Sequence, residues 1–118
     1  MIVAWLARFA ILAAGVGLTQ VSFSPFCDLA FDCGCRAVWA GADAACNIHD
    51  PSPPHCPWCL DGGLFGTASF LVIVSLQVGI AVWPGLGLLV RALATLVSFP
   101  LAGALLAALA GLWTGYWA

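Results

Sequence analysis

Residues 64–83 read LFGTASFLVIVSLQVGIAVW and contain no charged side chain. A run of about 20 mostly apolar residues is long enough to cross the hydrocarbon core of a bilayer as a helix. The run stops at Trp83-Pro84-Gly85-Leu86-Gly87, where proline and glycine favour a turn. The stretch therefore predicts a membrane span over about residues 63–83.

Two further runs flank this span, and both are apolar except for one arginine each, Arg8 and Arg91. They predict helices over about residues 2–24 and 88–114. Pro100 lies inside the second of these, where neighbouring helices can tolerate it. The expected fold is a single all-α integral membrane domain, residues 1–118, with three transmembrane helices and a cysteine-rich extracytoplasmic loop between the first two.

Composition supports this reading. Of the 118 residues, 64% are hydrophobic and 7% are charged, against about 25% charged in ordinary soluble domains. Three basic residues are too few to build a phosphate-binding face. The sequence therefore argues against a nucleic-acid binder and a standard soluble enzyme, and predicts the lipid bilayer as partner.

The arginines predict the orientation. Arg8 and Arg91 fall on one side of a three-span protein, and the positive-inside rule makes that side cytoplasmic. The N-terminus is then inside, the C-terminus outside, and the acidic loop on the periplasmic side of a bacterial inner membrane. Arg8 and the apolar run after it also fit a secretory signal peptide, but no A-x-A cleavage site follows, so we expect a retained span.

Residues 25–61 form the predicted outer cap, which holds every cysteine and histidine of the chain. An even number of cysteines outside the cytoplasm favours disulfides, and a segment this short needs such links to fold. We expect structural disulfides from Cys27, Cys33, Cys35 and Cys46, with a connectivity that the spacing leaves open.

The sharpest motif is His55-Cys56-Pro57-Trp58-Cys59. A C-x-x-C pair can cycle between dithiol and disulfide, and an adjacent histidine can stabilise the thiolate. Cys56 and Cys59 are thus the candidate catalytic redox pair, and His55 the candidate modulator. Over Cys56, Cys59 and the start of the next span, the arrangement resembles the membrane disulfide-forming quinone oxidoreductases. That family has four spans and a second outer cysteine pair, which this chain lacks.

Metal binding is a competing interpretation. Thiolates and imidazoles are ligands for zinc or copper. The predicted cap offers six candidate ligands: His49, His55, Cys33, Cys35, Cys56 and Cys59. A c-type haem site requires C-x-x-C-H, whereas Leu60 follows Cys59. The candidate cofactors are therefore a quinone or a zinc or copper ion, and c-type haem is not expected.

The third span carries small residues at every fourth position, Gly103, Ala107, Gly111 and Gly115. Such a stripe lets another helix approach closely, either within the protein or from another subunit. The spans contain no Asp, Glu, His or Lys, which argues against ion transport and against haem within the bilayer. A quinone pocket needs only aromatic and weakly polar walls.

Three functions fit these features. The first, which we predict, is a small accessory subunit of a larger membrane complex, such as an electron-transfer or energy-converting complex. The disulfide-bonded loop of this chain would cover that complex. The second is a thiol–disulfide oxidoreductase that uses Cys56 and Cys59 and is linked to a quinone. The third is zinc or copper handling. Whether the chain is an enzyme stays open at this stage.

Overall fold

The computed structural model describes residues 1–32, 56–58 and 64–116. Within these ranges the regular structure consists of the helices α1 (Ile2–Phe31), α2 (Leu64–Val82) and α3 (Leu88–Thr114). All three of these described helices are long and apolar enough to cross a membrane. The all-α fold and the three candidate spans predicted from the sequence are therefore confirmed.

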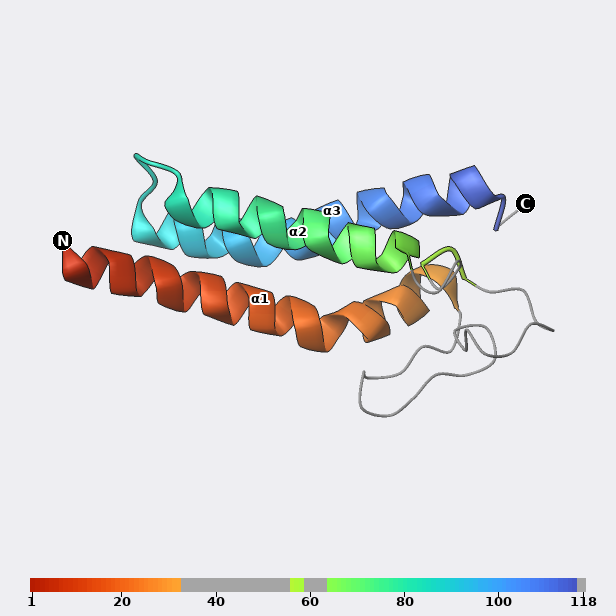
Figure 1. The fold of residues 1–118 in the computed structure, drawn as a ribbon, viewed down its shortest axis with the longest axis horizontal. Helices are drawn as coiled ribbons and strands as arrows, with labels where there is room; N and C mark the ends of the chain where they lie inside the picture. The colour runs from red at the N-terminus through yellow and green to blue at the C-terminus, as the bar shows by residue number, and fades with distance from the viewer. Residues whose placement is uncertain (33–55, 59–63, 117–118) are drawn as a thin grey trace.

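Helix α1 extends beyond the end expected near residue 24 and continues to Phe31. Pro25 lies inside it, and the helix bends in this part (Figure 1), because proline lacks the N–H that would bond one turn back. Asp32 caps the helix: its N–H donates to the Asp28 carbonyl at 2.7 Å, and its left-handed backbone (φ 49°) turns the chain out of the helix. Cys27 is consequently a helical residue and not part of an outer loop.

The described helices form one bundle in which each contacts the other two. Figure 1 shows α2 and α3 running side by side in opposite directions, with α1 along them. The N-terminus and the α2–α3 turn lie at one end of the bundle, and the C-terminal end of α3 and residues 56–58 lie at the other. We call these the turn end and the thiol end.

Arg91 organises the turn end. Its guanidinium is only 2% exposed and donates to the carbonyls of Ile80 (2.8 Å), Ala81 and Leu86 (2.9 Å). The first two belong to the last turn of α2, whose carbonyls have no partner within the helix. Arg91 therefore caps α2 from the first turn of α3, and its positive charge lies at the favourable, negative end of the α2 dipole.

A polar cluster joins the helices midway. Gln77 of α2 is fully buried, and its Nε2 donates to Thr19 Oγ1 of α1 at 2.9 Å and to the Thr95 carbonyl of α3 at 3.3 Å. Gly15 makes this approach possible, because a Cβ there would overlap the Thr95 methyl group. The cluster therefore links all three described helices at this level.

Candidate thiol site

Two cysteines meet at the thiol end. Cys27 lies in the last part of α1, and Cys56 opens the short segment 56–58 that precedes α2. Their exposed fractions are 3% and 0%, and their Sγ atoms are 3.5 Å apart. Two sulfurs in van der Waals contact need little movement to reach the roughly 2.05 Å of a disulfide bond.

Aromatic rings from α1 hold the segment that carries Cys56. Trp58, 2% exposed, stacks on Phe23 with ring centroids 4.7 Å apart and planes within 7°. Phe26 stacks at 6.1 Å, and Phe31 meets the indole edge-on at 5.5 Å. Such pairs add about 0.5–1.5 kcal/mol each beyond the area that they bury. These rings pack around Cys27 and Cys56 in one hydrophobic cluster.

The backbone of Trp58 is held separately, by α2. The Gly66 N–H donates to the Trp58 carbonyl at 3.1 Å. Gly66 lies in the first turn of α2, where backbone N–H groups have no partner within the helix. A Cβ at this position would come within 2.5 Å of the same carbonyl oxygen, so the contact requires glycine.

Helix α3 closes the site from the other side. The Tyr116 hydroxyl donates to the Phe31 carbonyl at 2.7 Å, and the two rings pack edge to face at 5.6 Å. Gly103 accommodates Phe26, whose Cε1 would lie 3.0 Å from an added Cβ. Ala107 belongs to the same buried cluster as Cys27 and Cys56.

The small-residue stripe is largely used inside the bundle. Gly103, Ala107 and Gly111 are buried, while Gly115 is exposed and ends α3 with a left-handed backbone (φ 66°). A surface for docking another subunit would therefore have to use other residues.

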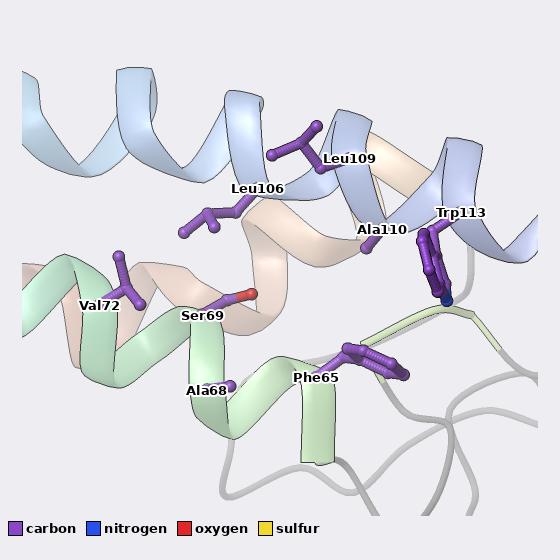
Figure 2. Close-up of a pocket in the computed structure, with 8 residues that line it drawn as sticks. All are labelled: Phe65, Ala68, Ser69, Val72, Leu106, Leu109, Ala110 and Trp113. Atoms are coloured by element: carbon purple, nitrogen blue, oxygen red, sulfur yellow. The ribbon is translucent and has the colours of Figure 1, made fainter.

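A shallow groove lies between α2 and α3 near the thiol end (Figure 2). Its volume is about 300 Å³, and the sticks in Figure 2 show Ser69 as a polar side chain among apolar ones. Phe65, Leu106 and Ala110 line it and also pack against the cluster around the two cysteines. With Phe65 and Trp113 among its walls, the groove is aromatic and weakly polar.

The structure describes only some of the cysteines and histidines that the sequence singled out. Cys56 is buried beside Cys27, which the sequence assigned to a structural disulfide. The others, His49, His55, Cys33, Cys35, Cys46 and Cys59, lie outside the described residues. Among residues 1–32, 56–58 and 64–116, no group of three His, Cys, Asp or Glu side chains is arranged to hold a metal ion.

The sequence does not place Cys27 beside Cys56, because a first span over about residues 2–24 already satisfies the bilayer thickness. A longer helix would have put Phe23, Cys27 and Phe31 at successive four-residue intervals, and so on one face. That periodicity was the available signal. No signal in the sequence points from that face to Cys56.

Fold and site together define a small, all-helical protein with membrane-length helices and a buried thiol pair at one end. No family model, curated protein or solved structure shows a significant match to this chain, so the site is interpreted from its own residues.

Proposed function

We propose that the protein is a membrane thiol–disulfide exchange protein in which Cys56 alternates between two partners, Cys27 and Cys59. One observation carries the proposal. The Cys27 and Cys56 sulfurs are 3.5 Å apart, and Cys56 is also the first cysteine of the C-x-x-C motif. A separation of about 3–3.5 Å is that of reactants poised for attack.

The proposed step is an exchange that needs no external oxidant. The Cys27 thiolate attacks Sγ of Cys56 in a Cys56–Cys59 disulfide. The Cys27–Cys56 bond forms as the Cys56–Cys59 bond breaks, and the electron pair of the broken bond leaves on the Cys59 sulfur. The proton that Cys27 loses balances the one that Cys59 takes up. The exchange thus moves a disulfide between the C-x-x-C motif and the buried end of α1.

Disulfide mapping tests this proposal. The protein is purified in mild detergent, equilibrated in redox buffers, trapped with acid and an alkylating agent, and analysed by mass spectrometry. We expect both Cys27–Cys56 and Cys56–Cys59 bonds in the wild type, Cys27–Cys56 alone in Cys59→Ser, and Cys56–Cys59 alone in Cys27→Ser. The proposal fails if Cys56 pairs only with Cys33, Cys35 or Cys46, or keeps one partner at every potential.

For net oxidation we propose a quinone as the electron acceptor. Two thiols become a disulfide by losing two electrons and two protons, which convert a quinone to its quinol. The groove between α2 and α3 supports this choice by its aromatic walls and by Ser69. Purified protein given a dithiol peptide and a soluble quinone analogue should form quinol, followed by absorbance. Disulfide exchange without quinol formation would exclude this acceptor.

We also propose that the thiol end faces the periplasm of a bacterial inner membrane, with the N-terminus inside and the C-terminus outside. The positions of Arg8 and Arg91 support this orientation, because the N-terminal part of α1 and the α2–α3 turn share one end of the bundle (Figure 1). Disulfides also persist in the periplasm. A C-terminal alkaline phosphatase fusion should be active, and an inactive fusion with a fluorescent C-terminal GFP fusion would reverse the orientation.

An accessory role in a larger membrane complex is the second candidate, with the segment between α1 and α2 stapled by disulfides and lying over the complex. The exposure of α1 favours this accessory role. Of the most apolar 18-residue stretch of each helix, 11% is buried in α1, against 28% in α2 and in α3. A membrane subunit or lipid must cover that face. A monomeric mass in gentle detergent, measured by light scattering, would contradict this candidate, and stoichiometric co-purification of other subunits would support it.

A further inference from the structure

The segment that carries Cys56 is attached to the bundle by two independent contacts. The ring of Trp58 stacks against α1, on Phe23 and Phe26. Its carbonyl accepts from the first turn of α2, at Gly66. The indole Nε1 has no hydrogen-bond partner within the described ranges, so packing and not hydrogen bonding holds the ring.

These contacts determine where Cys56 lies. Only Pro57 separates Cys56 from Trp58, and its ring fixes the backbone φ. A displacement of the Trp58 backbone is therefore passed on to Cys56. Because the Cys56 and Cys27 sulfurs are already 3.5 Å apart, a shift of about 1 Å is enough to disfavour their bond, given the narrow geometry of a disulfide.

We propose that Gly66 and Trp58 are the positioning residues of the thiol site: they hold Cys56 against Cys27 and so bias its disulfide toward Cys27 over Cys59. This inference rests on the exchange function proposed above. Neither residue reacts. Gly66 acts by lacking a side chain, which lets the Trp58 carbonyl approach α2, and Trp58 acts by filling the space among the α1 aromatic rings.

The test is the ratio of the Cys27–Cys56 to the Cys56–Cys59 disulfide, measured by trapping and mass spectrometry at a fixed redox potential. Gly66→Ala should lower this ratio about tenfold, which corresponds to about 1.4 kcal/mol, because the new Cβ displaces the Trp58 carbonyl. Gly79→Ala is the matched control on the same helix, since a Cβ there meets nothing within 4 Å.

Variants of Trp58 give a second measurement of the same disulfide ratio, which does not depend on how well Gly66→Ala folds. Trp58→Ala keeps the backbone carbonyl but removes the ring, and should lower the ratio about tenfold. Trp58→Phe keeps a ring that can stack and should restore the ratio to within about threefold of the wild type. Helix content by circular dichroism and elution as a single detergent complex identify the folded fraction on which the ratio is measured.

The outcomes separate the two proposals. If the wild type shows no exchange of Cys56 between Cys27 and Cys59, the proposed function fails. If the wild type exchanges but Gly66→Ala and Trp58→Ala keep the ratio of Gly79→Ala, the positioning role is refuted while the function stands. A ratio that falls in both variants and recovers in Trp58→Phe establishes the positioning role, because the ratio is measured only on the folded fraction, where partial unfolding cannot favour the short Cys56–Cys59 loop.

Discussion

The two ends of α2 are both capped by groups from outside the helix, but with opposite chemistry. At the turn end, Arg91 donates to the carbonyls of Ile80 and Ala81. At the thiol end, the Trp58 carbonyl accepts from the N–H of Gly66. A membrane helix needs partners for its terminal backbone groups. The charged cap joins the two ends of the α2–α3 turn, whereas the backbone cap anchors the segment that carries Cys56, the cysteine that we propose changes partners.

The largest expected effect is at the turn end. Arg91→Leu removes the three hydrogen bonds to the carbonyls of Ile80, Ala81 and Leu86, of which the one to Ala81 is fully buried. We expect a loss of about 4 kcal/mol of unfolding free energy, by analogy with unpaired buried polar groups, measured by denaturation in detergent. Arg8→Leu is the control, since Arg8 lies over the Trp5 ring at 5.1 Å and such contacts contribute about 1 kcal/mol or less at exposed sites. Equal losses would refute the capping role.

The thiol end should respond to redox state instead. A Cys27–Cys56 bond joins residues 29 positions apart, and closing a loop of this size stabilises by about 3.5 kcal/mol in the chain-entropy estimate. In a Cys59→Ser background, which leaves Cys27 as the partner of Cys56, the difference in unfolding free energy between oxidised and reduced protein should therefore be about 3.5 kcal/mol larger with Cys27 present than in Cys27→Ala. If the two differences are the same, the Cys27–Cys56 bond does not stabilise the fold, and the contrast between a redox-sensitive thiol end and a fixed turn end is refuted.

The middle of the bundle tests whether the helices hold their spacing independently of either end. Gly15→Ala places a methyl group against Thr95 and should cost about 2 kcal/mol, as overpacking typically does. Gly17→Ala, on the same helix, meets nothing within 4 Å and should be neutral or slightly stabilising. Thermal denaturation in detergent compares the pair. A neutral Gly15→Ala would show that α1 is loosely packed at this level.

The smallest effect is expected at Gln77. Gln77→Leu removes its hydrogen bond to Thr19 (2.9 Å) but also its own Oε1, which lacks a partner among the described residues. The two changes oppose each other, so we expect a net loss of about 1 kcal/mol or less. Denaturation of Gln77→Leu beside Thr19→Val measures it. A loss larger than that of Gly15→Ala would make the polar cluster, not close approach, the main determinant of helix spacing.

Much of the architecture could be read from the chain. The uncharged run at residues 64–83 and its flanks located the spans to within a few residues, except at the end of α1. The end of α1 differs because a helix ending near residue 24 already spans the bilayer, while the contacts that accompany its continuation, such as those of Phe26 and Phe31 with Trp58, are between segments distant in sequence. The C-x-x-C motif marked Cys56, but its neighbour Cys27 could not be found from spacing.

The sequence by itself determined that this is an all-helical protein with membrane-length helices, because hydropathy and charge act locally and add up along each segment. Only the tertiary structure decided which cysteine meets Cys56, which glycines admit a neighbouring backbone or ring, and that Arg91 is a cap as well as a charge. Those outcomes depend on distances between segments far apart in the chain, and packing sets these distances to a fraction of an ångström.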